Sequence, residues 1–521
     1  MENCREISTV EPLQGSCLRT GHPRVRSLRS RPWAVICNAF GVRNSFPCLA
    51  FAALCLATIV PARADIIFYR LPGSRTTLML QGSATFNPGG TLTFHHPKFG
   101  SIYFSTRETV VRKAPTIESR FNKELGRAGN DPAKLTEAAQ WALRRGLLPQ
   151  FYETVDKLRA ADPQNLRALM VSKLKQQIEL PIADSPQQEK ELRDLVGRSE
   201  MKIIKSRHFL LLHDTPDKPY PNHKLSRAEE RVQLLEQVYE SFLLRFYANG
   251  VELELPRERL KVVLFQEHKD YHFFATKLSP DLASASGFWC PTSNTSVFFD
   301  NGTTANFKEL SALSKQLQGV KKEAQRIRAA NAADIVRLAD TIAVLIEIDR
   351  ENSDIEVVSH ETTHQMAANT GLLPRHVMIP SWVHEGLATY FETPNGAAWG
   401  GIGAVNEQRL QWYRALESDR VHSNIDFIVG DQIFDFAASE GSTLHGYAQA
   451  WALTHFLLEK RFDQFMAFYR RLGEMPPEVQ LSADVLTELF NETVTKDHAI
   501  LDSEWRTYMR SLKTDLEVIL E

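Results

Sequence analysis

The sequence predicts an α+β fold built from more than one unit. Short β-prone runs separated by glycine and proline fill residues 65–113. A strand–helix–strand–strand order follows in residues 197–306, and apolar residues recur mostly at helical spacing after residue 307. A chain of 521 residues is too long for one hydrophobic core, so we expect two or three units.

The first 64 residues are expected to be an export segment. They hold eight arginines and three glutamates, a charge of about +5, which leaves about −7 on the remainder. An apolar run from Phe46 to Val60 ends at Ala62-Arg-Ala64, a pattern typical of signal-peptide cleavage. The run is short for a spanning helix and contains Pro47, so we expect cleavage after Ala64, no stable membrane anchor, and a periplasmic or extracellular location. A buried helix is the alternative interpretation.

Cysteine content and charge narrow the possible functions. Five of the six cysteines fall within the export segment, which leaves only Cys290. A single cysteine cannot form an internal disulfide or a cysteine-rich zinc site, so we interpret Cys290 as a small packed residue. The composition is ordinary for a soluble globular protein, and the net charge of −2 gives no reason to expect a nucleic-acid partner.

Two small units are expected to follow the export segment. Residues 65–113 contain four β-prone runs and should form a small β unit. Residues 114–196 turn helical, with one helix–turn–helix of roughly the size of a TPR repeat. Because three or more such repeats are needed for a superhelix, we interpret this TPR-like pair as a packing adaptor, with peptide binding as the alternative.

The next part, residues 197–306, should form an α/β unit. Its strand candidates are Lys205–Leu212, Leu260–Phe265 and Thr295–Phe299, and an amphipathic helix from Ala228 to Phe246 separates the first two. Thr295–Phe299 is our candidate for a strand that pairs with an extended ligand by β-augmentation. An interior core strand is the alternative.

Residues 307–350 are rich in alanine, lysine, glutamine and arginine and are expected to form a helical insertion, in the form of a hairpin. Its basic run is most simply a solvated face, and a lid or a partner surface is the alternative. The run comprises Lys321, Lys322, Arg326 and Arg328.

The most informative motif is His360-Glu361-Thr-Thr-His364. Residues four apart share one face of a helix, so the two imidazoles can bind a single ion. Glu361 then lies beside that ion and can act as a general base on a water molecule. The flanking residues predict a mostly buried helix, with Ser353 or Asp354 as the N-cap. Solvated histidines on a surface helix are the alternative, which a buried helix disfavours because unpaired buried imidazoles are costly.

A second motif follows in residues 380–392, and it matches a Trp-x-x-Glu-Gly-x-Ala-x-Tyr-x-Glu pattern. The matching positions are Trp382, Glu385, Gly386, Ala388, Tyr390 and Glu392. With these two motifs the chain resembles the gluzincins, zinc metallopeptidases whose third ligand is a glutamate on a second helix.

The resemblance implies a zincin-like unit, in which a small mixed sheet and an active-site helix precede a helical C-terminal subdomain over residues 351–521. It also implies a Zn²⁺ ion held by His360, His364 and Glu385, with one coordination position open for water. Glu392 and His384 are candidates for orienting these ligands, although a surface position is an equal alternative for His384.

The segment Tyr447–Leu457 resembles the tyrosine-led helix of aminopeptidase-like gluzincins. That resemblance implies that Tyr447 donates to the oxyanion formed during hydrolysis, with His445 as a second candidate for the same role. A core position is the alternative for Tyr447. The Gly-x-Met-Glu-Asn segment of true aminopeptidases is missing from the sequence, and Ser286–Pro291 is not a substitute for it. The chain is therefore most similar to exported bacterial proteins of the peptidase-MA-like type, a poorly characterised group.

These features predict an exported zinc metallopeptidase, and we favour an endopeptidase, that acts on a peptide or protein substrate. The alternative is a catalytically silent relative that serves as a binding or envelope-assembly module. An intact Glu361 argues against a silent protein, because such a protein has no need of a base. The sequence leaves open the substrate, the oligomeric state, and whether residues 65–196 are a pro-segment or a permanent module.

Overall fold

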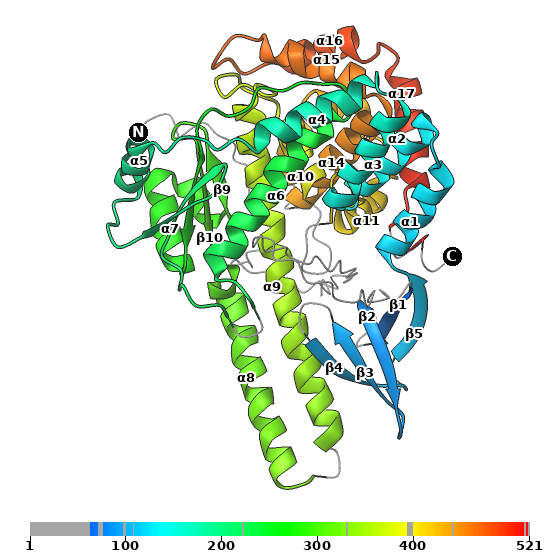
Figure 1. Cartoon of the computed structure of the whole chain (residues 1–521). Helices are drawn as coiled ribbons and strands as arrows, with labels where there is room; N and C mark the ends of the chain where they lie inside the picture. The colour runs from blue at the N-terminus through cyan, green and yellow to red at the C-terminus, as the bar shows by residue number, and fades with distance from the viewer. Residues whose placement is uncertain are drawn as a thin grey trace, which may run out of the picture.

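The computed structural model is a mixed α+β protein with two five-stranded sheets and a larger number of helices, which confirms the predicted fold class (Figure 1). It describes residues 63–70, 77–96, 100–107, 109–220, 223–329, 332–392, 400–439, 442–514 and 517–518. The predicted export segment lies outside the described residues, except for Arg63 and Ala64 at the start of the first strand.

The first sheet is antiparallel throughout and has the strand order β4-β3-β2-β1-β5. Its strands are β1 (Arg63–Arg70), β2 (Thr77–Asn87), β3 (Thr91–His96), β4 (Gly100–Ser105) and β5 (Thr109–Pro115). Strand β5 is additional to the four predicted runs. Its exposed Arg112 and Lys113 weaken the apolar alternation by which a strand is recognised.

One face of this sheet packs against a long helix from the middle of the chain. The buried residues of that face, which include Tyr69, Phe94 and Phe104, form one cluster with Ile348 of helix α9 (Ala332–Asn369). The β unit is therefore attached to the side of the same helix that carries the histidine motif further along (Figure 1).

Five helices follow the first sheet and pack on the rest of the molecule. They are α1 (Ile117–Ala128), α2 (Pro132–Leu143), α3 (Leu148–Ala161), α4 (Leu166–Ile178) and α5 (Pro186–Val196). The predicted TPR-like pair corresponds to α2 and α3. Their buried residues belong to the same hydrophobic core as the helices around the candidate site, and Tyr152 of α3 donates to Glu240 Oε1 at 2.6 Å.

The second sheet is mixed, with the order β6-β7-β8-β10-β9. Its strands are β6 (Lys202–Lys205), β7 (Phe209–His213), β8 (Leu260–Phe265), β9 (Phe288–Cys290) and β10 (Thr295–Phe299). The parallel strands β7, β8 and β10 form its centre, and every residue of β10 is buried. Thr295–Phe299 is thus an interior strand, which the sequence left as the alternative, and the edge position belongs to the short strand β9.

Helix α6 (Arg227–Tyr247) covers this sheet and packs against α9. It begins at a capping box in which the Ser226 side chain accepts from the Glu229 backbone and the Glu229 side chain accepts from the Ser226 backbone. Helix α7 (His268–Leu278) packs against β8 and β10.

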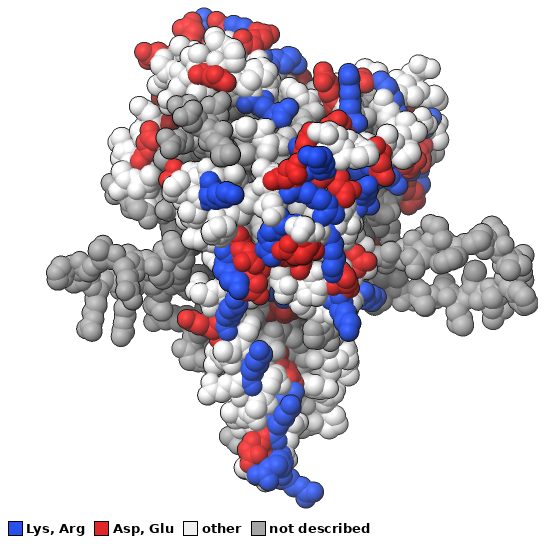
Figure 2. Space-filling view, turned by 90° about the vertical axis from the view of Figure 1, so that its left-hand side faces the viewer, with Lys and Arg blue, Asp and Glu red and all other residues white. Residues whose placement is uncertain are grey.

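Helix α8 (Ala305–Arg326) and the first part of α9 pack side by side as a helical hairpin that projects from the body of the molecule (Figure 1). In Figure 2 basic residues gather towards the free end of this hairpin. Lys321 pairs with Asp340 at 2.6 Å, whereas Lys322, Arg326 and Arg328 are exposed.

The predicted start of the active-site helix at Ser353 or Asp354 is wrong. Helix α9 runs without a break from Ala332 to Asn369, and both residues are buried inside it. The Asp354 carboxylate contacts Arg227 at 2.9 Å and Arg231 at 3.1 Å instead of capping a helix. The local sequence suggests Asp354 as a helix cap. Its charge can instead be buried inside the helix because two arginines of α6 neutralise it.

The C-terminal part is helical, as predicted. It contains α10 (Ser381–Phe391), α11 (Glu407–Leu416), α12 (Ile425–Val429), α13 (Ile433–Ser439), α14 (Thr443–Lys460), α15 (Phe462–Gly473), α16 (Ala483–Thr493) and α17 (His498–Ser511). Helices α10 and α14 approach each other closely at Gly386, which has no Cβ. A Cβ at this position would stand 2.2 Å from Thr454 Oγ1. This close approach brings residues of α10 and α14 to one site beside α9. Within the described part of the chain, no helix has both the length and the apolar character to cross a bilayer.

Candidate metal centre

Helix α9 presents its motif from a buried stretch. His360, Glu361 and His364 are each less than a tenth exposed. The spacing of four residues places the Nε2 atoms of the two histidines 3.0 Å apart. The helix therefore supplies two imidazole lone pairs that face one point.

Glu385 of α10 meets these imidazoles from the opposite side. Its Oε2 lies 3.0 Å from His360 Nε2, and its Oε1 lies 3.7 Å from His364 Nε2. The ligand atoms of the three residues all lie within 4.8 Å of one another. The structure thus brings together the three residues that the sequence resemblance implied as metal ligands.

Asp431 holds the start of α10 in place. Its carboxylate accepts from the backbone N–H of Ser381 at 2.9 Å and of Trp382 at 3.0 Å. These are two of the donors that the first turn of a helix leaves without intrahelical partners. Asp431 therefore acts as a remote cap for the helix that carries Glu385.

The three residues fit a metal ion. Two imidazole nitrogens and one carboxylate oxygen form the ligand set of many catalytic zinc sites. Glu385 Oε2 is buried and makes no hydrogen bond of acceptable geometry with any described residue. A buried carboxylate oxygen without a donor is costly, and a cation would satisfy it.

Glu392 orients the first histidine. Its Oε1 accepts from His360 Nδ1 at 2.7 Å, which leaves the Nε2 lone pair of His360 directed at Glu385. Its Oε2 accepts from Arg409 Nη2 at 2.6 Å. The Arg409 guanidinium and the His360 hydrogen bond hold the pKa of Glu392 below its usual value despite complete burial.

Glu361 lies beside the same site but is not one of the three candidate ligands. Its Oε2 accepts the backbone N–H of Trp289, on the edge strand β9, at 2.9 Å. Burial raises the pKa of Glu361 to about 7. A carboxylate with a pKa near neutrality is well suited to take up and release a proton.

Of the two predicted oxyanion donors, the structure brings only Tyr447 to the cluster. Its ring centroid lies 6.2 Å from that of His360, and the residue is almost fully buried. His445 packs against Trp412, with ring centroids 5.2 Å apart. Among the described residues, no hydrogen bond, ion pair or ring contact joins His445 to the candidate ligands or to Glu361.

His384 lies at the partly exposed side of the centre. Its ring stacks on that of His364 with centroids 3.7 Å apart and an angle of 6° between the planes. Its Nδ1 lies 3.6 Å from Glu385 Oε1. His384 thus contacts two of the ligands and limits how their side chains can rotate.

Two residues at the site could not be identified from the sequence. Trp289 contributes a backbone N–H, and a three-residue edge strand leaves almost no periodic pattern. Arg409 lies in an ordinary amphipathic helix. The only sign of its role in the sequence is that it falls on the apolar face of that helix, next to Leu410 and Tyr413, where a charge would be buried. Both contacts join segments that are far apart in the chain, so no local pattern reports them.

A second group of potential ligands, His223, Glu230 and Glu351, is better explained as an ion-pair network. His223 is bonded through both ring nitrogens, to Glu230 at 2.6 Å and to Glu347 at 3.0 Å. Arg227 contacts both Glu230 and Glu351. A cation would have to displace protons and compete with an adjacent guanidinium, so this group fits a metal ion poorly.

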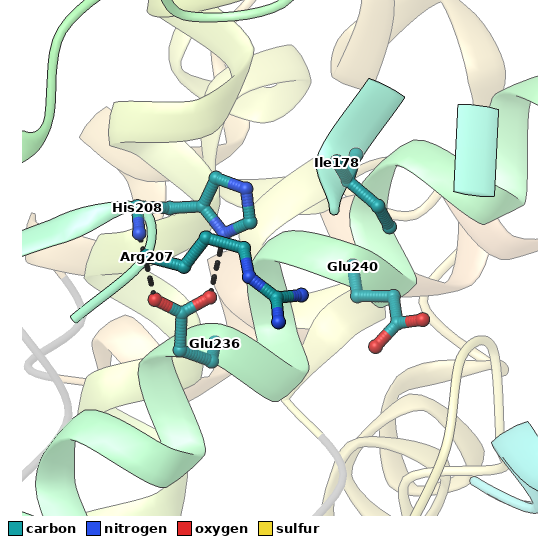
Figure 3. Close-up of a pocket in the computed structure, with 5 residues that line it drawn as sticks. All are labelled: Ile178, Arg207, His208, Glu236 and Glu240. Atoms are coloured by element: carbon teal, nitrogen blue, oxygen red, sulfur yellow. Dashed lines mark hydrogen bonds and ion pairs between the residues drawn. The ribbon is translucent and has the colours of Figure 1, made fainter. Parts of the chain in front are cut away.

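A cavity of about 260 Å³ lies between α4, the β6–β7 turn and α6 (Figure 3). His208 is bonded through Nδ1 to Glu236 Oε2 at 2.6 Å, and Figure 3 shows the Arg207 side chain between Glu236 and Glu240. His208 and Glu236 are thus paired with each other, and Glu240 accepts from the Tyr152 hydroxyl at 2.6 Å. The cavity shares no residue with the metal centre and marks the junction between α4 and α6.

Comparison with known protein families gives a match over part of the chain. Residues 354–478 are similar to a family described as "Protein of unknown function (DUF1570)". The matched region contains all three candidate ligands, Glu361, Glu392, Arg409 and Tyr447. No curated protein and no solved structure matches the chain.

Proposed function

We propose that this chain is an exported zinc-dependent metallopeptidase of the gluzincin type, and that it acts as an endopeptidase. One observation carries the proposal: His360, His364 and Glu385 converge while Glu361, held by a backbone N–H, stands beside them. A structural zinc site would need no separate buried carboxylate with a pKa near neutrality.

The residues of the centre divide the work of peptide hydrolysis. Zinc supplies a Lewis acid that acidifies water and polarises a carbonyl group. Glu361 takes a proton from the attacking water and gives it to the nitrogen of the amine that leaves. The Tyr447 hydroxyl donates a hydrogen bond to the oxyanion, and burial, which raises the pKa of Tyr447, keeps that hydroxyl protonated.

The edge strand β9 supports an extended peptide as the substrate. It lies at the border of its sheet, next to Glu361, so the outer backbone groups that Glu361 does not occupy can pair with another strand. The sequence lacks the segment with which true aminopeptidases bind a free amino terminus. Both points favour cleavage within a chain over removal of the first residue.

Export is the part of the proposal that rests on residues 1–64 alone. Their arginines, apolar run and Ala-x-Ala pattern support secretion and a periplasmic or extracellular location. Expression in a secreting host followed by N-terminal sequencing tests this directly. A mature chain that begins at or near Asp65 supports export, and a retained N-terminus contradicts it.

The catalytic proposal is tested by zinc content and by turnover of a peptide library. We expect one zinc per chain in the wild type and in Glu361→Gln, with turnover lost only in the variant. Glu309→Gln, which changes an exposed glutamate of α8, serves as the matched control and should cleave like the wild type.

The remaining outcomes separate the alternatives. One zinc per chain without turnover of any peptide favours a catalytically silent binding or envelope-assembly protein. A wild-type chain that binds no zinc, and whose stability is unchanged by a chelator, rules out the metallopeptidase and the silent zinc protein alike.

A further inference from the structure

Arg409 is a fully buried cation in the first turns of α11. The helix is fixed to the end of α10 by Asn406, whose Nδ2 donates to the Glu392 carbonyl at 2.9 Å. The Asn406 side chain also accepts from the Arg409 backbone N–H at 3.1 Å and so caps α11. This arrangement delivers the Arg409 side chain to the back of the metal centre.

The guanidinium of Arg409 lies between two glutamates and the ring of Tyr447. Its Nη2 donates to Glu392 Oε2 at 2.6 Å and lies 3.4 Å from Glu356 Oε1. Its Cζ stands 5.4 Å from the centroid of the Tyr447 ring. Since Glu392 Oε1 accepts from His360 Nδ1, Arg409 is connected to the candidate ligand His360 through Glu392 and also lies over the ring of Tyr447.

The charges explain why an arginine stands here. Glu385 and Glu392 are both buried and both contact His360, so two buried anions lie close together at this site. A guanidinium on Glu392 compensates the second anion and keeps its oxygen available to the His360 Nδ1–H. Among the described residues, Nε and Nη1 of Arg409 have no hydrogen-bond acceptor. Its interactions are therefore concentrated on Glu392, Glu356 and the aromatic face.

We infer that Arg409 is a positioning residue with two separable effects. Its charge holds Glu392 as the anionic acceptor that orients His360 towards the metal ion. Its planar face fixes the ring of Tyr447, and with it the hydroxyl that donates to the oxyanion. This inference rests on the proposed function and adds a residue that neither sequence motif contains.

The two effects predict different results for two substitutions. Arg409→Met removes the charge and the planar face, so zinc affinity should fall about 10- to 100-fold, as for the loss of other partners of metal-binding histidines. Arg409→Lys keeps a charge near Glu392 but loses the planar face. It should keep zinc affinity within about threefold of the wild type, while kcat falls at least about tenfold and KM stays the same.

A double substitution tests the connection through Glu392. Glu392→Gln together with Arg409→Met should lose no more zinc affinity than Glu392→Gln alone, because the charge effect of Arg409 passes through that carboxylate. Arg414→Met is the matched control on the same helix. Arg414 is partly exposed and pairs with Glu517 at 2.7 Å, so its loss should change neither zinc affinity nor kcat.

The experiment measures zinc affinity by competition with a chromophoric chelator, and kcat and KM on a peptide that the wild type cleaves. Circular dichroism tests whether each variant is folded. If Arg409→Met does not fold, Arg409→Lys decides alone, because the inference predicts for it an almost unchanged zinc affinity together with a lower kcat. The inference is overturned if Arg409→Lys and a folded Arg409→Met both keep the zinc affinity and the kcat of the wild type. That result leaves the proposed function intact. A wild-type chain without zinc overturns the proposed function itself.

Discussion

The backbone N–H of Trp289 donates to Glu361 Oε2 across 2.9 Å and so joins the edge strand β9 to the candidate base on α9. The bond is possible because β9 approaches α9 closely, and a Cβ at the preceding Gly287 would stand 2.6 Å from Val357 Cγ1. The edge strand of the second sheet therefore also positions the carboxylate that would serve as the base.

Removal of this one donor should lower turnover. Trp289→Pro deletes the N–H that holds Glu361, and we expect kcat to fall about 10- to 100-fold because a base displaced by about 1 Å is much less effective. Trp289→Ala keeps the N–H and is the control for loss of the indole. Equal kcat values for the two variants would show that the bond to Glu361 has no catalytic effect.

Substitution of Gly386 should push two helices apart. A Cβ at this position would stand 2.2 Å from Thr454 Oγ1 and 2.8 Å from the Ala450 carbonyl. Gly386→Ala should therefore destabilise the protein by about 1–3 kcal/mol or more, measured by urea unfolding, and should also weaken zinc binding by the neighbouring Glu385.

The control for this substitution lies on the projecting hairpin. Gly319 of α8 has open space around its Cα, so Gly319→Ala should be neutral or should stabilise the protein by up to about 1 kcal/mol. An unfolding free energy of Gly386→Ala equal to that of the wild type would mean that α10 and α14 tolerate a wider separation than their packing implies.

Asp431 should contribute to zinc affinity although it is no ligand. Asp431→Ala leaves two N–H groups of α10 without their acceptor and should cost about 1 kcal/mol of stability, with a measurable loss of zinc affinity. Asp431→Asn keeps an accepting oxygen and tolerates the left-handed backbone at this position, where φ is 60°. It should bind zinc more tightly than Asp431→Ala; identical affinities would count against the remote cap.

His223 should make stability depend on pH above neutrality. Hydrogen bonds to Glu230 and then Glu347 raise the pKa of His223 from 6.5 to about 9. The protonated form is therefore favoured by folding, so its stabilisation is complete below pH 6.5 and is lost as the pH rises through about 9.

The measurement is urea unfolding between pH 6 and pH 9.5 for the wild type and His223→Gln. The advantage of the wild type should be of order 2–3 kcal/mol at the lower pH and should shrink towards the upper end. Parallel curves for the two proteins would show that His223 does not titrate with the folding equilibrium.

Helices α1–α4 should stay attached after the chain is cut. They share one hydrophobic core with α6 and α14, and the Glu459 carboxylate of α14 is bonded to both Arg144 and Tyr390. A protease site inserted between Leu180 and Ser185, in the exposed connection to α5, should give two fragments that co-elute in gel filtration. Separation of the fragments, with activity in the C-terminal one, would identify the N-terminal region as a pro-segment.

Zinc removal should lower thermal stability only where the ligand set is intact. A ligand that binds the native state alone raises the melting temperature, because it stabilises that state by RT ln(1 + L/Kd), where L is the free ligand concentration. We expect a chelator to lower Tm in the wild type and to leave the Tm of His364→Ala unchanged. A chelator effect of the same size in both proteins would point to zinc bound elsewhere.

The sequence was most informative where a feature depends on residues that are close together along the chain. The pair His360 and His364 follows from helical spacing, and the Glu385 segment was recognised because its pattern is contiguous. Local signals also misled, since Asp354 resembles an N-cap but lies buried inside a helix that began 22 residues earlier. Nothing in the neighbouring residues reveals that two arginines of α6 compensate its charge.

The sequence by itself determined the candidate ligands, their spacing along two helices, and the mixed α+β class. Only the tertiary structure decided that Tyr447, and not His445, stands beside His360, that β9 is the edge strand, and that Arg409 connects Glu392 to Tyr447. The physical reason is that helical periodicity is fixed within a few residues of backbone. The choice between two side chains of one helix, or the burial of one arginine, depends on which distant elements pack against them.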